Sequence, residues 1–200
     1  MKDILVGKLN MKIAVVGLHN HYGKDSAGDV KMLRELGQKY GFLVHMIKPL
    51  YLEDELLCSS TKVRELIAGG EVEKAAELLG RPFKIKKTVV KDKMLGKTMG
   101  YPTANMIPDT TYLLPQFAVY ATTTYVDGVA YKSITNVGES PTLKDGQIRI
   151  ETHLLDFDKD VYDQALEVEF LYKIRDQKDF GDLEALKAQL AEDEKVRLQK

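Results

Sequence analysis

Residues 117–135 read FAVYATTTYVDGVAYKSIT, and this stretch decides the fold class of the carboxy-terminal part of the chain. Valine, tyrosine and threonine dominate residues 117–126 and 129–135, and these residue types favour β-strands. Asp127-Gly128 lies between the two runs and supplies the positive backbone φ angles that a type I′ turn needs. The stretch therefore predicts an antiparallel β-hairpin.

Further strand signals follow the hairpin. Asp145-Gly146 marks another turn, which leads into an expected strand over 147–157, and 165–174 is expected to form one more. Antiparallel strands at this spacing predict a small β-barrel.

A helix is expected to close the chain. Asp182 has the residue type and position of its N-cap, and the remaining charged residues are expected to be solvated. One helical face is expected to be apolar, formed by Leu183, Leu186 and Leu190.

The first 80 residues have a different pattern, in which strand and helix signals alternate. Gly80 followed by Pro82 is a strong stop signal for the last of these helices. We therefore expect an α/β segment over 1–80 and a separate domain over 82–200. The elements expected in the first segment are strands over 13–17 and 42–47 and helices over 30–40, 61–68 and 71–79.

Composition excludes several classes of protein. The 200 residues carry a net charge of -1, which disfavours a sequence-independent nucleic-acid binder. A single cysteine, Cys58, excludes an internal disulfide framework and fits a reducing compartment. No apolar run approaches the roughly 20 residues of a membrane-spanning helix. We expect a cytoplasmic protein with no nucleic-acid or membrane partner.

The string GKTMGYPTAN at 96–105 is the most unusual motif of the chain. A P-loop would need glycine at position 91, which is Lys91, so that interpretation fails. The alternative is a glycine-containing flap whose backbone amides approach phosphate oxygens. Thr103 and Asn105 would project to one side of an extended backbone, where their oxygens suit Mg²⁺. A proline turn with two incidental polar residues is the other interpretation.

The expected strand over 148–157 carries a second candidate. Arg149, Glu151 and His153 alternate onto one face of it. A carboxylate on a rigid strand could accept a proton from an attacking hydroxyl, although an ordinary solvent-facing glutamate would give the same pattern. We expect His153 to be structural.

Taken together, these strings resemble the riboflavin kinase family. Its Gly-x-Pro-Thr-Ala-Asn motif is matched at 100–105, and the ordered matches extend over the rest of the chain. The further matches are Asn-x-Gly-x-x-Pro-Thr at 136–142, Glu-x-His-x-x-Asp-Phe at 151–157, Val168-Glu169-Phe170, and Ile174-Arg175 followed by Phe180.

The resemblance implies an α+β chain with a six-stranded antiparallel β-barrel and a terminal helix. It also implies transfer of the ATP γ-phosphoryl group to the 5′-hydroxyl of riboflavin, which gives FMN, with Mg²⁺ as cofactor. The roles that it implies are Glu151 as general base, Thr103 and Asn105 as ligands of Mg²⁺ and ATP phosphates, Gly96 and Gly100 in the phosphate-binding flap, and Arg175 and Phe180 at the flavin.

Residues 1–80 resemble the second part of the FMN adenylyltransferase half of bacterial bifunctional riboflavin kinase/FMN adenylyltransferases. That half is Rossmann-like, and its ATP-activating His-x-Gly-His motif has no match here. We therefore expect no FMN adenylyltransferase activity, and Ser59 to Arg64 is expected to be a relic of nucleotide binding. Two parallel strands cannot cover both faces or both edges, so this segment is expected to pack on the barrel or to form a homo-oligomer.

Three departures from the family pattern affect the kinase half. Asp92, Ala118 and Asp163 stand where the family has glycine, and Asp92 would place negative charge near ATP phosphates. That repulsion would weaken nucleotide binding and turnover. The alternative to an active kinase is a non-catalytic flavin-binding or regulatory protein derived from the bifunctional enzyme. A structural or interaction module, with the α/β segment as its working surface, is a third interpretation.

Overall fold

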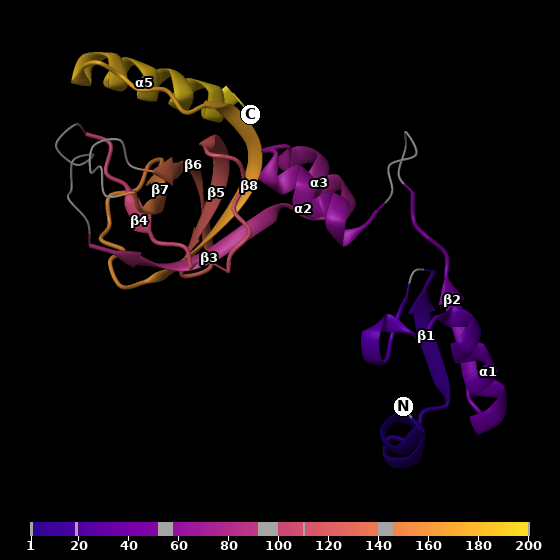
Figure 1. The fold of residues 1–200 in the computed structure, drawn as a ribbon. Helices are drawn as coiled ribbons and strands as arrows, with labels where there is room; N and C mark the ends of the chain where they lie inside the picture. The colour runs from indigo at the N-terminus through magenta and orange to yellow at the C-terminus, as the bar shows by residue number, and fades with distance from the viewer. Residues whose placement is uncertain are drawn as a thin grey trace. The chain divides into compact units, whose positions relative to one another are not determined.

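The computed structural model divides the chain into two compact units, Met1–Cys58 and Ser59–Lys200, each described here by itself (Figure 1). Among the described residues, no helix is both long and apolar enough to cross a membrane. The structure describes residues 2–18, 20–51, 58–91, 100–109, 111–139 and 146–199.

A two-stranded parallel sheet with one long helix forms the first unit, as the sequence predicts. Strands β1 (Ile13–Gly17) and β2 (Leu43–Ile47) pair in parallel, and helix α1 (Val30–Tyr40) joins them. Asp29 caps α1 by accepting a hydrogen bond from the Met32 amide at 2.7 Å. The short helices of this unit are the π-helix η1 (Lys2–Lys8) and the 3₁₀ helix η2 (Lys24–Ser26).

One face of this small sheet is apolar and exposed. Ile13 pairs with Leu43, and Gly17 with Ile47, at the two ends of the register. Ile13, Leu43 and Ile47 are 56%, 70% and 55% exposed. The other face is covered in part by α1, where the backbone of Gly37 comes so near that an added Cβ would lie 2.6 Å from the Phe42 carbonyl oxygen. The sheet thus leaves apolar surface without cover among the described residues of its unit.

Helices α2 (Ser60–Ala68) and α3 (Val72–Leu79) belong to the second unit, although the sequence predicted them in the first. Val72 is fully buried in the core of the barrel, and α3 contacts strands of that barrel. The division between compact units therefore follows Cys58, whereas the sequence placed it near residue 81. Helical periodicity identifies an apolar face but does not indicate which core buries it.

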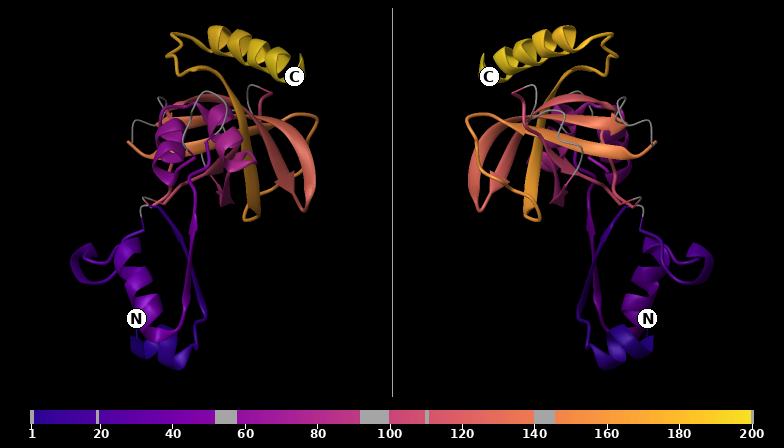
Figure 2. Two further views of the ribbon diagram at one scale, coloured as in Figure 1. Left: turned by 90° about the vertical axis from the view of Figure 1, so that its right-hand side faces the viewer. Right: turned by 90° about the vertical axis from the view of Figure 1, so that its left-hand side faces the viewer.

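The barrel is six-stranded, closed and antiparallel, which confirms the predicted fold class (Figures 1 and 2). The predicted hairpin is present, with Val126 paired to Val129 and positive φ angles of 49° and 81° at Asp127 and Gly128. The order of the strands around the barrel is β3-β4-β7-β6-β5-β8. The strands are β3 (Phe83–Val90), β4 (Ala104–Met106), β5 (Ala118–Val126), β6 (Val129–Glu139), β7 (Ile148–Leu154) and β8 (Ala165–Asp176).

The barrel interior combines an apolar core with a ladder of buried hydroxyl groups. The core includes the fully buried side chains of Met106, Tyr120, Ile150 and Phe170. The hydroxyl ladder joins β5, β6 and β7 through contacts of 2.8 to 2.9 Å, because each hydroxyl can donate and accept. In order, its members are Thr124, Ser133, Thr122, Thr135 and Thr152.

Helix α5 (Leu183–Gln199) lies against the barrel and begins where the sequence predicts (Figure 2). Asp182 caps it, since the Ala185 amide donates to Asp182 Oδ1 at 2.7 Å. The expected apolar face was partly wrong, because Leu183 is 63% exposed whereas Asp193 and Arg197 are 1% and 3% exposed. The helix therefore docks through buried charged groups that have partners on the barrel.

Candidate active site

A row of side chains on the outer face of the barrel contains three of the predicted site residues, Asn105, Glu151 and Arg175. Asn105 on β4 lies directly opposite Glu151 on β7, and Glu151 lies opposite Asn136 on β6. The row continues through Val119 on β5 to Arg175 on β8. Directly opposed residues of antiparallel strands project to the same face, about 4.5–5.5 Å apart. The strand register thus places Glu151 beside Asn105.

Glu151 projects away from the barrel core, because its neighbours in sequence project into it. Ile150 and Thr152 are both fully buried, whereas Glu151 is half-buried. Its Oε2 accepts a hydrogen bond of 3.1 Å from Asn136 Nδ2. This bond holds the Glu151 carboxylate in one orientation, as a candidate general base requires.

Asn105 presents an oxygen that can bind a cation. Its Nδ2 donates to Thr103 Oγ1 at 3.3 Å, which brings the two predicted ligands together. Its Oδ1 is buried and has no hydrogen-bond partner among the described residues. A buried amide oxygen without a partner is costly, and a hard cation would satisfy it. The Thr103–Asn105 pair therefore fits a hard cation such as Mg²⁺.

The loop that contains Thr103 and leads into β4 is tied to β7. Gly100 has a φ angle of 83°, which favours glycine at the bend. His153 Nδ1 contacts the Pro102 carbonyl oxygen at 2.8 Å, and the Tyr101 ring packs edge-on against His153 at 5.3 Å. A carbonyl oxygen can only accept, so Nδ1 carries the proton in this contact. His153 thus has the structural role that the sequence predicts, holding the loop beside Glu151.

Arg175 and Phe180 lie at the other end of the row. The Arg175 guanidinium carbon lies 5.6 Å from the centroid of the Phe180 ring. Its Nη2 donates to Asp193 Oδ2 at 2.8 Å, and its Nε lies 3.0 Å from Asp193 Oδ1. Arg175 is therefore bound to helix α5 through Asp193, and its guanidinium group packs against the Phe180 ring. In this arrangement Arg175 holds the Phe180 ring in position.

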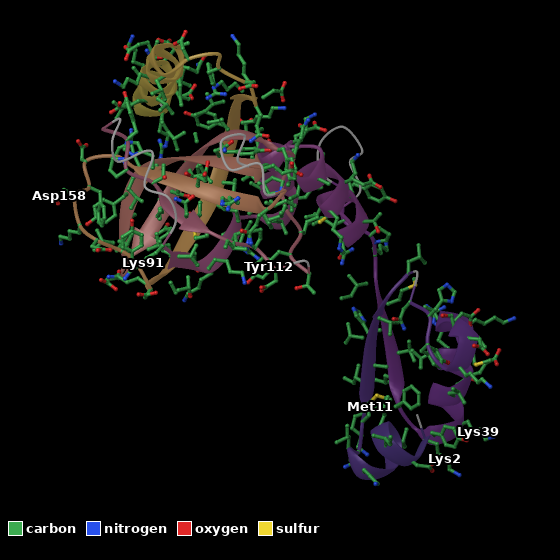
Figure 3. The ribbon with its side chains drawn as sticks, turned by 60° about the vertical axis from the view of Figure 1, so that its left-hand side comes forward. Lys2, Met11, Lys39, Lys91, Tyr112 and Asp158 are labelled. Carbon is green, nitrogen blue, oxygen red and sulfur yellow. The ribbon has the colours of Figure 1, made fainter. Side chains whose placement is uncertain are left out.

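Two of the predicted features lie outside the described residues, and two departures from the family pattern can be placed. Gly96 and Asp92 lie outside the described residues, whereas Gly100 of the same predicted flap is described. Lys91, labelled in Figure 3, precedes them. Its Nζ lies 5.9 Å from the Tyr162 ring centroid. Asp163 has a φ angle of 62°, a conformation that aspartate tolerates better than most residues. Ala118 is fully buried within the barrel wall.

Asn136, Gln177 and Asp193 are the residues of this region to which sequence reasoning gave no role. Asn136 stands in the Asn-x-Gly string, so a signal for it was present. Gln177 and Asp193 carry no comparable signal, because their contacts join segments that are distant in sequence: Gln177 Nε2 donates to Asn136 Oδ1 at 2.9 Å, and Asp193 binds Arg175.

Two protein families match the chain. The riboflavin kinase family matches residues 79–199, and the FAD synthetase family matches residues 1–62. The first match covers more than half of the chain and includes every residue of the row described above.

Curated relatives match nearly the whole chain. The bifunctional riboflavin kinase/FMN adenylyltransferase of Pseudomonas fluorescens is 38% identical over 191 residues, which is 95% of this chain and 61% of the relative. The protein of the same name from Escherichia coli K12 is 36% identical, over 97% of this chain and 62% of the relative. The chain thus spans about three-fifths of the length of the relatives that it matches.

A solved structure supports the same fold. A crystal structure from Streptococcus pneumoniae, titled as a macrolide-efflux protein, has a TM-score of 0.84 and 32% sequence identity. The match covers 96% of this chain and 62% of that one. As with the curated relatives, the similarity extends over both compact units.

Proposed function

Because the chain belongs to the riboflavin kinase family, we propose that it transfers the γ-phosphoryl group of ATP to the 5′-hydroxyl of riboflavin, giving FMN and ADP. The observation that carries this proposal is the register that sets Glu151 directly across from Asn105. It sets the carboxylate that we propose as proton acceptor beside the amide that we propose as cation ligand, on two neighbouring strands. Phosphoryl transfer needs mainly positioning and charge neutralisation, which Mg²⁺ held by Asn105 would supply, and the role proposed for Glu151 is that of the base for the attacking hydroxyl.

Each residue of the row has a defined part in the proposed reaction. Glu151 accepts the proton of the riboflavin 5′-hydroxyl as that oxygen attacks the γ-phosphorus. Thr103 and Asn105 would hold Mg²⁺, which neutralises phosphate charge when bound. Phe180 offers an aromatic face for the flavin, and Arg175 supports it. Gly96 and Gly100 are proposed to let backbone amides approach the phosphates.

The decisive experiment mixes the full chain with riboflavin and Mg-ATP and follows FMN by chromatography. Glu151→Ala should lower kcat about 10²- to 10⁴-fold, the usual contribution of a general base. Glu167→Gln is the control, because Glu167 is another strand carboxylate of the barrel and pairs with Lys84. Unchanged turnover in Glu151→Ala would refute the role of Glu151. Riboflavin binding without ATP consumption by the unaltered chain would instead support a non-catalytic flavin-binding protein.

Three further proposals concern the chain as a whole. FMN adenylyltransferase activity is proposed to be absent, and FAD formation from FMN and Mg-ATP would overturn this. The segment of β1 and β2 is proposed to self-associate through its exposed strand edge, since the outer edges of these strands have no partner strand among the described residues. Sedimentation showing a monodisperse monomer would contradict self-association. A cytoplasmic location rests on the reducing compartment that a single cysteine favours.

A further inference from the structure

Two side-chain amides connect the segment after β8 to the candidate base. Gln177 Nε2 donates to Asn136 Oδ1 at 2.9 Å. Asn136 Nδ2 in turn donates to Glu151 Oε2 at 3.1 Å. The Glu151 carboxylate can only accept, so Asn136 meets it with Nδ2 and is left with Oδ1, which accepts the bond from Gln177.

A glycine provides the place in which the Gln177 amide lies. An added Cβ on Gly138 would be 2.3 Å from Gln177 Nε2 and 2.5 Å from Gln177 Oε1. Real Cβ atoms do not approach other atoms so closely, so only glycine leaves room for the amide at this point of β6. Gly138 follows Asn136 by two residues on the same strand, and both face the same side. Glycine here therefore has a packing reason that is connected to the site.

We propose that Gln177 and Asn136 form an amide relay that positions Glu151, with Gln177 holding the Asn136 amide in the direction that the carboxylate requires; this rests on the proposed kinase function. Neither amide exchanges a proton with substrate in this scheme. Both are positioning residues, and their effect on the reaction passes through Glu151. The relay also connects the base to the segment that carries Phe180, because Gln177 and Phe180 belong to the same connection between β8 and α5.

Reversing the polarity of the relay is the sharpest perturbation. Gln177→Glu keeps the shape of the side chain but replaces its donor with acceptors. The new carboxylate would attract Asn136 Nδ2, and the Asn136 amide could meet it only by turning Nδ2 away from Glu151, which would then face Oδ1. The hydrogen bond from Asn136 to the Glu151 carboxylate is then lost, and Asn136 Oδ1 faces a carboxylate oxygen of Glu151, which is repulsive. We therefore expect kcat to fall about 100-fold. Gln177→Ala removes the constraint without reversing it, and about a 5- to 10-fold fall is expected.

Controls separate this effect from charge and from substrate binding. Lys187→Gln makes the same change of one negative unit on helix α5, where the described ion pair of Lys187 is with Glu184. It should leave kcat within about twofold, as expected for an exposed ion pair. The KM for riboflavin should change less than kcat in both Gln177 variants. Equal kcat in Gln177→Glu and Lys187→Gln would overturn the proposal.

Gly138→Ala tests the same relay without altering any of its polar groups. The new methyl group would displace the end of the Gln177 side chain, which can move, so kcat should fall as in Gln177→Ala. If Gly138 acts only by making room for Gln177, the double variant that combines Gly138→Ala with Gln177→Ala should have the same kcat as Gln177→Ala alone. Fully additive losses in kcat would show that Gly138 acts by another route and would contradict this part of the proposal.

A spectroscopic measurement makes the outcome independent of turnover. In a nitrogen-edited NMR spectrum of the full chain, the Asn136 side-chain amide signal is identified by its loss in Asn136→Ser. The signal should move in Gln177→Glu and in Glu151→Gln, and should stay in place in Lys187→Gln. If the unaltered chain makes no FMN, the kinase proposal fails while this test of the relay still stands. If the signal does not move in Gln177→Glu, the relay is refuted whatever the activity.

Discussion

Replacing Asp193 with alanine should release helix α5 from the barrel more than any other single change in that helix. The Asp193 side chain is 1% exposed, and its Oδ2 accepts from Arg175 Nη2 at 2.8 Å. Its Oδ1 accepts from Arg175 Nε at 3.0 Å and from Gln189 Nε2 at 2.9 Å. Asp193→Ala therefore removes the acceptor of a largely buried guanidinium and leaves that cation without its carboxylate.

The expected cost follows from the burial of the two partners. Removing one member of a buried ion pair costs about 3–5 kcal/mol, because the remaining charge has lost its counter-ion. The Arg175 side chain is 20% exposed, so water can rehydrate part of the guanidinium. We therefore expect the low end of the range, about 3 kcal/mol. Arg197, which donates to the Thr122 carbonyl oxygen at 3.1 Å, should keep the last turns of α5 near the barrel.

Hydrogen exchange in α5 measures this directly. A loss of about 3 kcal/mol should speed the exchange of protected amides in 183–199 by about 10²-fold. Glu192→Ala is the matched control, because the adjacent Glu192 pairs with Lys195 while both side chains are at least 60% exposed. That variant should cost less than about 0.5 kcal/mol. Equal exchange rates in the two variants would refute the assignment of Asp193 as the main anchor of the helix.

Two further predictions concern the cation and alkaline pH. Asn105→Ala should raise the Mg²⁺ concentration for half-maximal FMN formation about tenfold, because one oxygen ligand is lost; an unchanged Mg²⁺ titration would exclude Asn105 as a ligand. Burial raises the pKa of Tyr120 above its ordinary value of 10.0, so its contribution to stability is complete below pH 10 and is lost as pH rises further. Above pH 10, the free energy of unfolding measured with urea should therefore fall less steeply with pH in Tyr120→Phe than in the unaltered chain. The same dependence on pH in both proteins would count against this account.

Local features of the fold could be predicted from the sequence, because their causes lie within a few residues. The β5–β6 hairpin follows from Asp127-Gly128, and the start of α5 follows from Asp182. The placement of Asn105 opposite Glu151 depends on a strand register between distant segments, which no local pattern contains. Only the resemblance to a family predicted that these two residues act together.

The interface of α5 could not be predicted from its pattern of apolar residues. Hydrophobic periodicity selects leucines, yet Leu183 is 63% exposed. In the sequence, Asp193 and Arg197 have the pattern of charges that face solvent. They can be buried because Arg175 donates to Asp193, and because Arg197 donates to the Thr122 carbonyl oxygen. Buried charges with partners are therefore invisible to a hydrophobic pattern.

The hydroxyl ladder inside the barrel helps to fix the strand register that aligns the side chains of the outer row. Thr135 and Thr152 are paired across β6 and β7 and share a hydrogen bond of 2.9 Å inside the barrel. The next pair along these strands is Asn136 with Glu151, which points outward. A shift of the strand register by one residue would expose the hydroxyls and turn the Glu151 carboxylate into the barrel core. The shift would therefore be unfavourable on both faces of the barrel wall. Apolar side chains would tolerate other pairings more readily than hydroxyls that must be satisfied, so the polar interior specifies the register on which the candidate site depends.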